Sequence, residues 1–376
     1  IKINNYKHEA QERLIVEELA TNLIGVKIAS EKINKLKAKQ MQVSKEEVEL
    51  FKQNLPFKLT NAQERTIKEI SDDISLEKPM RRLVQGDVGS GKTVVAAVSM
   101  YISAKNNTQS VLLCPTEVLA EQHFKNFSAW FKNSNIKIEL LTGKMPVSKR
   151  RGIYQDLEDG VIDILIGTHA VFQDKVKMKN LGLVVVDEQQ RFGVKQRFDL
   201  VKKSSDQIMP HQLFMTATPI PRTLAMTIFA DLETSKIDEL PPGRKPVETL
   251  VYSDKKKDEI VKRLETVCKS GNQVFWLCTM IEESENLDVQ AADEAKEWIK
   301  ENTNGLNIGL VHSKLSKDQR DKAIENFRSG KTDVLVCTTV IEVGMDVPNA
   351  SLMVIENAER LGLSQLHQLR GRVGRK

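Results

Sequence analysis

The sequence has no long apolar run, and its few cysteines are scattered. The most apolar stretch, residues 181–186, is far shorter than the roughly 18–20 residues that a membrane-spanning helix needs. We therefore expect no membrane span. The cysteines show no paired spacing, and three lie in apolar runs where a small buried residue fits, so we expect free thiols and a reducing, cytoplasmic setting. They are Cys114, Cys268, Cys278 and Cys337.

The sequence also lacks a strong net charge, low-complexity segments and short-period repeats. Its 376 residues include 56 Lys and Arg and 51 Asp and Glu, which gives a net charge of +5. This mildly basic balance allows a polyanionic partner without requiring one. The length suffices for two domains and a small third piece. Because the chain does not begin with Met, we expect it to start partway into a longer protein.

Composition changes along the chain predict three regions. Residues 1–56 are rich in Glu, Lys, Leu and Ile and predict two or more helices, whose mixed charges form solvated faces rather than a binding site. From residue 57, short β-branched runs alternate with amphipathic segments, which is typical of parallel strands joined by crossover helices. Pro241-Pro242-Gly243 indicates an inter-domain linker. We predict α/β domains over residues 57–238 and 239–376.

Each predicted domain is a doubly wound parallel sheet, so the architecture repeats. The first domain has six predicted strands, at residues 82–84, 110–114, 138–141, 162–167, 183–187 and 212–216. The second has five, at residues 249–252, 273–279, 307–311, 334–338 and 352–356.

A glycine-rich stretch between a predicted strand and an apolar predicted helix fits the phosphate-loop pattern (P-loop) of nucleoside triphosphate sites. Glycines let backbone N–H groups point at the β-phosphate, and the helix adds its positive end. The lysine would reach the β- and γ-phosphates, and the threonine hydroxyl would hold Mg²⁺. The residues are Gly86, Asp87, Val88, Gly89, Ser90, Gly91, Lys92 and Thr93.

An acidic pair follows a second apolar strand. Asp187 and Glu188 come directly after residues 183–186, and ligands of open parallel sheets collect at the carboxyl ends of strands. One carboxylate there can bind Mg²⁺ and the next can activate the attacking water. An ordinary acidic turn is the alternative, and the phosphate loop upstream favours the functional interpretation.

Two further patterns are weaker by themselves. Thr216 and Thr218 offer two hydroxyls on one side of extended chain, which a plain turn before Pro219 would also explain. Arg370, Arg372 and Arg375 are separated by small residues and suit phosphate oxygens, although a basic chain end would attract any polyanion.

Together these stretches resemble the superfamily 2 helicases and translocases, and within them the branched-DNA helicases. The resemblance covers residues 8–376 and includes a Q motif at Phe57-Lys58-Leu59-Thr60 with Gln63. It continues through the phosphate loop, a DEAH-like box, and the stretches PTEVLAEQH (115–123), GTHA (167–170), TATPIPRT (216–223), TTVIEVGMDVP (338–348) and QLRGRVGR (368–375). It implies two tandem RecA-like domains with an N-terminal helical extension.

The resemblance also implies residue roles. ATP would be bound by Phe57, Gln63, residues 86–93, Gly344 and Asp346, with Mg²⁺ held by Thr93 and Asp187. Catalysis would use Lys92, Asp187, Glu188, Arg372 and Arg375. DNA would be contacted through sugar and phosphate by Pro115, Thr116, Gly167, Thr168, His169, Thr338 and Thr339. Gln190, Thr216 and Thr218 would couple the two sites.

The implied function is an ATP-dependent DNA translocase and helicase that remodels stalled replication forks and branch-migrates junctions in recombination and repair. We expect a monomer that acts on branched or duplex DNA. The family places a wedge domain before this region and a hairpin after it, and residues 1–56 resemble the helical connector that follows the wedge. We therefore expect weak fork recognition from these residues alone. Two alternatives are a transcription-repair coupling translocase and a nucleotide-switched nucleic-acid clamp without turnover.

One position departs from the family pattern. The box usually reads Asp-Glu-x-His, whereas this chain has Gln190 at the fourth position. Glutamine keeps hydrogen-bonding ability but loses a titratable ring, so we expect ATP hydrolysis to survive with modestly altered coupling to DNA. DNA-stimulated ATPase measurements on Gln190→His test this. An inert natural chain whose turnover the substitution restored would contradict it.

Overall fold

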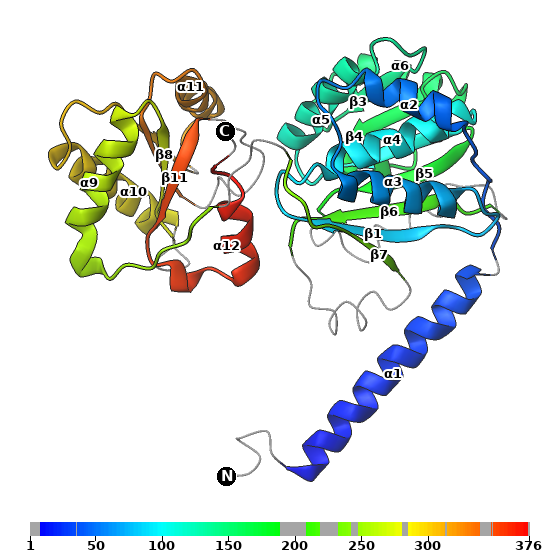
Figure 1. The fold of residues 1–376 in the computed structure, drawn as a ribbon, viewed down its shortest axis with the longest axis horizontal. Helices are drawn as coiled ribbons and strands as arrows, with labels where there is room; N and C mark the ends of the chain where they lie inside the picture. Colours follow the sequence, from blue (N-terminus) through cyan, green and yellow to red (C-terminus); the bar gives the residue numbers. More distant parts are fainter. Residues whose placement is uncertain are drawn as a thin grey trace. The chain divides into compact units, whose positions relative to one another are not determined.

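A computed structural model describes residues 8–34, 36–188, 208–218, 232–241, 247–279, 285–312, 314–338, 347 and 349–374. The chain divides into two compact units, Ile1–Glu239 and Leu240–Lys376 (Figure 1). Each is an α/β unit built on a parallel sheet. The predicted fold class, two tandem doubly wound domains with a helical extension, is confirmed.

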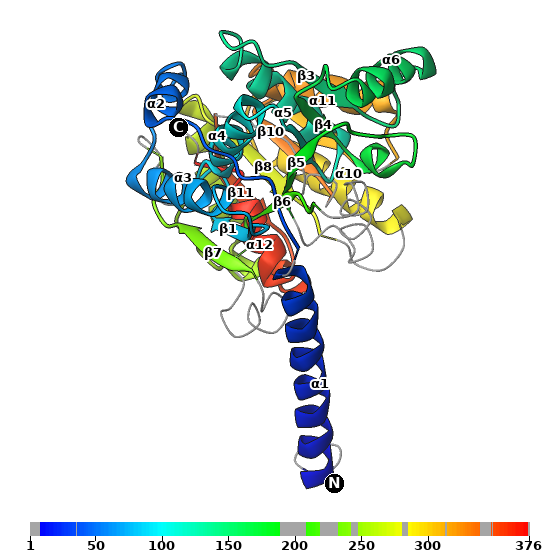
Figure 2. The ribbon, with the colours of Figure 1, turned by 90° about the vertical axis from the view of Figure 1, so that its right-hand side faces the viewer.

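The N-terminal region is helical, as predicted. Helix α1 spans Glu9–Asn34 and helix α2 spans Lys45–Gln53 (Figures 1 and 2). Ser44 caps α2 by accepting a hydrogen bond from the Glu47 backbone N–H. The buried ring of Phe51 stacks on Tyr101 with 4.5 Å between ring centroids, which fastens α2 to the sheet-covering helix that carries Tyr101.

The first sheet has seven parallel strands in the order β3-β4-β2-β5-β6-β1-β7. The predicted six were found, and a seventh was missed. The missed strand, β7, has the polar sequence ETSKI and buries only Ser235 and Ile237, because it is an edge strand with one covered face. The strands are β1 Arg81–Gly86, β2 Gln109–Leu113, β3 Ile138–Leu141, β4 Ile164–Gly167, β5 Leu181–Val186, β6 His211–Thr216 and β7 Glu233–Ile237.

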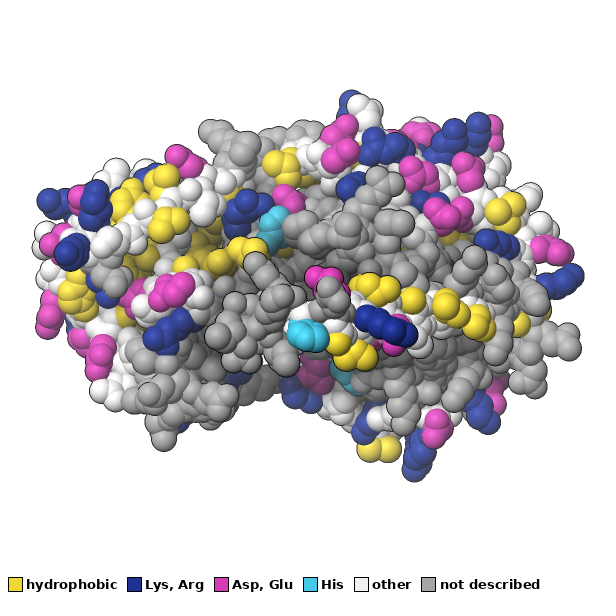
Figure 3. Space-filling model, turned by 90° about the horizontal axis from the view of Figure 1, so that it is seen from below, with side chains coloured by type: hydrophobic (Ala, Val, Ile, Leu, Met, Phe, Trp, Pro, Cys, Tyr) yellow, Lys and Arg dark blue, Asp and Glu magenta, His cyan; other side chains and the backbone are white. Residues whose placement is uncertain are grey.

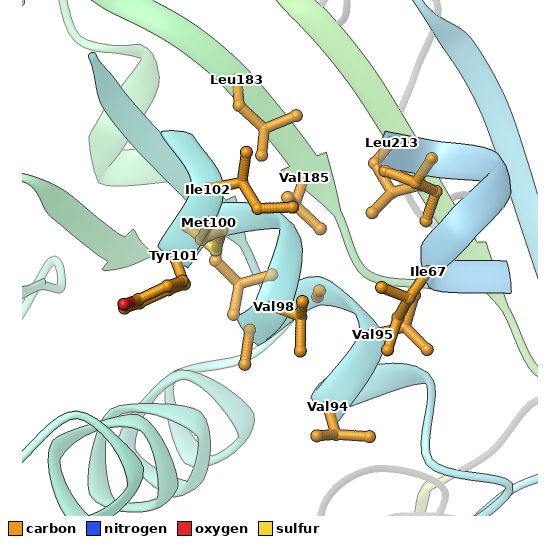
Figure 4. Close-up of a cluster of buried hydrophobic side chains, with 14 of the residues drawn as sticks. Ile67, Val94, Val95, Val98, Met100, Tyr101, Ile102, Leu183, Val185 and Leu213 are labelled. Carbon is orange, nitrogen blue, oxygen red and sulfur yellow. The ribbon is translucent and has the colours of Figure 1, made fainter. Parts of the chain in front are cut away.

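Helices cover both faces of this sheet, so its central strands are apolar throughout. One face packs against α2, α3 (Asn61–Ile74), α4 (Lys92–Lys105) and α5 (Glu117–Trp130). The other packs against α6 (Val147–Glu158) and the short 3-10 helix η1 (His169–Phe172). Figure 4 shows Val95 and Val98 of α4 in the same cluster as Val185 of β5 and Leu213 of β6. The helix after the phosphate loop is thus anchored in the core.

The second unit has a four-stranded parallel sheet in the order β11-β8-β10-β9. Its strands are β8 Gln273–Leu277, β9 Ile308–Val311, β10 Val334–Cys337 and β11 Ala350–Ile355. Helices α9 (Lys257–Lys269) and α10 (Glu285–Glu301) cover one face, and α11 (Lys317–Arg328) and α12 (Leu363–Arg370) cover the other. Two 3-10 helices, η3 (Asp254–Lys256) and η5 (Ala358–Arg360), complete the described elements.

The predicted strand at residues 249–252 was wrong. These residues form no strand, and the side chain of Val251 is 96% exposed. The β-branched run had the composition of a strand, but in the described parts of the chain it has no neighbouring strand to pair with, and composition alone does not supply one.

All four cysteines are buried and free, whereas apolar surroundings had predicted burial for three of them. Burial raises the pKa of the Cys268 thiol to about 11. Among the residues described, no helix combines the length and apolar character that crossing a membrane requires.

His211 joins the connector to the first sheet. Its buried ring accepts a hydrogen bond at Nδ1 from the Met80 backbone N–H (2.9 Å) and donates from Nε2 to the Lys39 carbonyl (2.8 Å). This pairing requires the neutral ring. Burial lowers the pKa of His211, and the bond to Lys39 and the charge of Asp73 offset this only in part.

The pKa of His211 is lower in the folded state than its ordinary value of 6.5, so the neutral ring contributes its full stabilisation at pH values above 6.5. This contribution is lost as the pH falls from 6.5 through the folded-state pKa. We expect His211→Asn to lower the free energy of unfolding near neutral pH by about 1–3 kcal/mol, because one buried partner is left unpaired. The substitution should also reduce the additional loss of free energy of unfolding between neutral and acidic pH. Urea unfolding at about pH 7.5 and about pH 5.5 tests both points. An equal pH-dependent loss in both proteins would show that His211 is not the titrating group.

Candidate nucleotide site and strand-binding edge

The sheet order gathers the predicted site segments of the first unit along one edge. The carboxyl ends of parallel strands meet there, and β4, β2, β5, β6 and β1 are consecutive neighbours. The phosphate loop follows β1, the threonine turn follows β6 and the acidic pair follows β5. The predicted DNA-contacting stretches follow β2 and β4. Predicted ATP-binding and DNA-binding residues therefore occupy adjacent halves of a single edge.

The phosphate loop connects β1 to α4. Gly89 and Gly91 have φ angles of 78° and 87°, in the left-handed region that favours glycine. The buried Lys92 side chain donates from Nζ to the carbonyl oxygens of Gly86 (2.7 Å) and Asp87 (2.9 Å). The ammonium group thus lies against the loop backbone, where the pattern places the phosphates.

Gln63 ties the predicted Q motif to this loop. Thr60 and Gln63 form a reciprocal capping box at the start of α3, and Gln63 Nε2 donates to the Ser90 carbonyl at 2.8 Å. A Cβ atom added at Gly91 would lie 2.1 Å from Gln63 Nε2, so the approach requires glycine. Phe57 is 44% exposed and packs edge-on against Trp130 of α5, with 5.8 Å between ring centroids.

Asp187 is held by a histidine from α5. His123 Nε2 lies 2.9 Å from Asp187 Oδ2, and the two side chains are only 8% and 11% exposed. Burial by itself raises the pKa of Asp187. The hydrogen bond from His123 and the charges of His123 and Lys92 outweigh it, so the pKa lies below its ordinary value. The carboxyl group is therefore ionised, and His123 Nε2 is the donor.

Glu188 has a φ angle of 52°, a left-handed conformation that residues other than glycine, asparagine and aspartate rarely adopt. The strain lies at the residue predicted to activate water. Backbone strain of this kind persists where the surrounding structure fixes it, and it is frequent at active sites.

The threonine turn lies between the phosphate loop and the acidic pair. Thr216 Oγ1 and Thr218 Oγ1 are 2.8 Å apart, and the Thr218 carbonyl accepts from Gln85 Nε2 at 3.3 Å. Gln85 directly precedes the phosphate loop and pairs with Thr216 in the sheet register. The turn therefore contacts the strand that leads into the nucleotide site.

The predicted DNA-contacting residues of the first unit come together at β2 and β4. The backbone N–H of Cys114 donates to the Gly167 carbonyl at 2.8 Å, which aligns Pro115-Thr116 with Gly167-Thr168-His169. Thr116 caps α5 by accepting from the Leu119 N–H, and His169 is exposed.

Fewer predicted residues of the second unit are described. Thr338 follows β10 and is buried, and Arg372 follows α12 and is half-buried. Thr339, Gly344, Asp346, Arg375 and, from the first unit, Gln190 lie outside the described residues.

Sequence reasoning did not single out His123 or Gln85. His123 stood within the motif-like stretch of residues 115–123, but its partner lies 64 positions away. Gln85 stood near the end of the strand before the phosphate loop, a strand that also carries Arg81 and Arg82. No pattern in the sequence linked either residue to its partner.

The donor set fits Mg²⁺ bound together with a nucleotide. No cluster of three or more His, Cys, Asp or Glu side chains that could hold a metal ion occurs in the described parts of the chain. Mg²⁺ commonly takes one or two protein oxygens and completes its shell with phosphates and water. The ionised Asp187 and the half-buried Thr93 supply oxygens of that kind.

Two family models match the two units. The DEAD/DEAH box helicase model covers residues 60–227, and the helicase conserved C-terminal domain model covers residues 255–376. Both models describe helicase domains, which agrees with predicted nucleotide-binding and DNA-binding residues that lie along one edge of the first sheet.

Individual relatives give a closer match. ATP-dependent DNA helicase RecG of Haemophilus influenzae is 49% identical over 98% of this chain and 54% of its own length. RecG of Escherichia coli K12 is 48% identical over the same shares, and RecG of Aquifex aeolicus is 47% identical over 99% of this chain and 47% of its own length. The chain thus spans about half the length of the curated relatives it matches.

A solved structure agrees with these relatives. The structure of RecG bound to a three-way DNA junction superposes with a TM-score of 0.79 at 40% identity and covers 97% of this chain and 48% of that one. The helicase MrfA bound to DNA, at 16% identity and a TM-score of 0.65, shares the fold. The chain belongs to the RecG family of superfamily 2 helicases.

Proposed function

We propose that this chain is the ATP-hydrolysing motor of a DNA translocase and helicase that acts on branched DNA. The observation that carries the proposal is the shared edge of the first sheet. It holds a complete phosphate loop, an ionised Asp187 beside Lys92, and the strand-contacting turns of β2 and β4 on neighbouring strands. A nucleotide at one half of this edge can influence a nucleic-acid strand at the other half through direct contacts.

In the proposed reaction, the loop amides and Lys92 bind the phosphates, and Thr93 and Asp187 hold Mg²⁺. When bound, that ion would supply positive charge beside the phosphates. Glu188 accepts a proton from the attacking water, whose oxygen bonds to the γ-phosphorus while the bond to the β-phosphate oxygen breaks and ADP leaves. Arg372 and Arg375 contact the γ-phosphate, Gly344 and Asp346 respond to the nucleotide, and Thr216 with Thr218 and Gln190 relays its state.

The proposed DNA contacts are independent of base sequence. Pro115, Thr116, Gly167, Thr168, His169, Thr338 and Thr339 offer backbone amides, hydroxyls and one imidazole, which suit sugar and phosphate oxygens. Lys and Arg alternate with Asp and Glu over the described surface seen in Figure 3.

The RecG relatives suggest the substrate. One of them is described as bound to a three-way DNA junction. We extend this to the present chain and propose that it contributes to remodelling stalled forks and migrating junctions, as a monomer in the cytoplasm.

ATP hydrolysis measured with different DNA structures tests the motor proposal. We expect a three-way junction or a duplex to raise the rate well above that without DNA, and single-stranded DNA of equal nucleotide content to raise it less. Lys92→Ala, which removes the phosphate-binding ammonium, is the matched inactive control. Hydrolysis that no DNA stimulates would contradict a DNA motor, and stimulation by single strands alone would contradict a duplex or branched substrate.

Two substitutions at one position separate catalysis from stability. Glu188→Gln should slow phosphate release by about 10²–10⁴-fold while ATP still binds, because the proton acceptor is lost. Glu188→Gly should lose hydrolysis equally but raise the free energy of unfolding by about 1 kcal/mol, since glycine relieves the strain at a φ of 52°.

Phosphate-release kinetics, binding of a fluorescent ATP analogue and urea unfolding measure the three quantities. A Glu188→Gln protein that hydrolyses ATP at the natural rate would show that another group activates the water.

A further inference from the structure

We propose that His123 is a positioning residue for ATP hydrolysis, which orients the carboxylate of Asp187 and links it to the strand-contacting start of helix α5. This inference rests on the function proposed above and adds a residue and a route to it. The route runs from the turn at Pro115-Thr116 along α5 to the ionised carboxylate.

The His123–Asp187 bond fixes one carboxylate oxygen. His123 Nε2 donates to Asp187 Oδ2 at 2.9 Å, and both side chains are largely shielded from water. The Asp187 backbone N–H also donates to the Leu113 carbonyl at 2.9 Å, so the main chain is held at the same place. The Glu188 backbone N–H also donates to this carboxylate, so two donors set its orientation. Partners of this kind orient a metal-binding carboxylate.

The imidazole ring is itself held in place. Phe127 lies one turn further along α5 and packs edge-on against the ring, with 6.4 Å between centroids and an interplanar angle of 79°. Phe127 is fully buried in the core on this face of the sheet. His123 therefore moves with α5 rather than as an independent side chain.

The second ring nitrogen of His123, Nδ1, indicates a role beyond packing. His123 Nδ1 is buried and has no hydrogen-bond partner among the residues that the structure describes. Leaving a polar atom buried without a partner is unfavourable, and an apolar side chain of similar size would avoid it. An apolar side chain at this position would, however, lose the hydrogen bond that His123 Nε2 donates to Asp187.

Helix α5 connects this bond to the predicted DNA contacts. Thr116 caps the helix, and His123 is seven residues further on, about 10 Å along the axis at 1.5 Å per residue. Cys114, two residues before Thr116, donates its backbone N–H to the Gly167 carbonyl at the neighbouring predicted DNA-contacting turn. A DNA strand that shifted these turns would tilt α5, and the His123 ring would move with the helix. The orientation of Asp187 would then depend on whether DNA is bound.

Three variants test this. His123→Leu removes the donor at similar size, His123→Gln keeps an N–H donor near the position of Nε2, and Phe127→Leu loosens the packing of α5 while leaving both His123 and Asp187. The readouts are the Mg²⁺ concentration for half-maximal ATPase, the ratio of ATPase with and without a three-way junction, and Mn²⁺ binding with a non-hydrolysable ATP analogue, followed by electron paramagnetic resonance.

For His123→Leu we expect metal affinity to fall by about 10–100-fold in both the Mg²⁺ and Mn²⁺ measurements, with most of the DNA stimulation lost. His123→Gln should recover most of both. Phe127→Leu should lower the unfolding temperature and weaken metal binding only slightly, because the ring loses part of its packing while the His123–Asp187 hydrogen bond is retained.

A His123→Leu protein with natural metal affinity and natural DNA stimulation would overturn the inference, whatever its stability. Phe127→Leu reproducing the full metal defect would overturn it too, because loosened packing would then suffice as the cause. Weakened metal binding with intact DNA stimulation would refute the link along α5. If the natural chain hydrolysed no ATP, the proposed function would fail, and Mn²⁺ binding would still decide whether His123 orients Asp187.

Discussion

Parallel pairing of five strands is the constraint on which the site of the first unit depends. Backbone hydrogen bonds set Leu113, Gly167 and Val186 at one level across β2, β4 and β5, and Phe214 of β6 pairs with Val186. Each segment that follows its strand beyond this level therefore emerges at the same edge of the sheet. The acidic pair, the phosphate loop and the turns predicted to contact DNA are brought together by sheet register before any side chain contributes.

Side chains then refine what the register provides. Gln63 connects α3 to the phosphate loop, Gln85 connects β1 to the threonine turn, and His123 connects α5 to Asp187. Each bond joins segments that are adjacent at the edge but belong to different elements. A change at one segment therefore reaches the next through a defined contact, which is what a motor needs if nucleotide and DNA are to affect one another.

Much of this arrangement could be predicted from the sequence, and the exceptions have physical causes. The glycines before Lys92 predict the phosphate loop, because only glycine adopts the left-handed backbone conformation of this loop without strain. The strand β7 was missed because an edge strand with a polar sequence carries little apolar signal, and residues 249–252 were wrongly predicted because β-branched composition does not supply a pairing partner. The role of His123 depends on a contact across 64 positions, which only the fold reveals.

Lys92 has a consequence for the shape of the phosphate loop. Its ammonium group bridges the carbonyl oxygens of Gly86 and Asp87, so the loop is curled around a cation of its own chain. The conformational entropy of loop formation is therefore included in the folding of the unit. At the proposed site, a phosphate group would compete with these two carbonyl oxygens for the same N–H donors of the ammonium group.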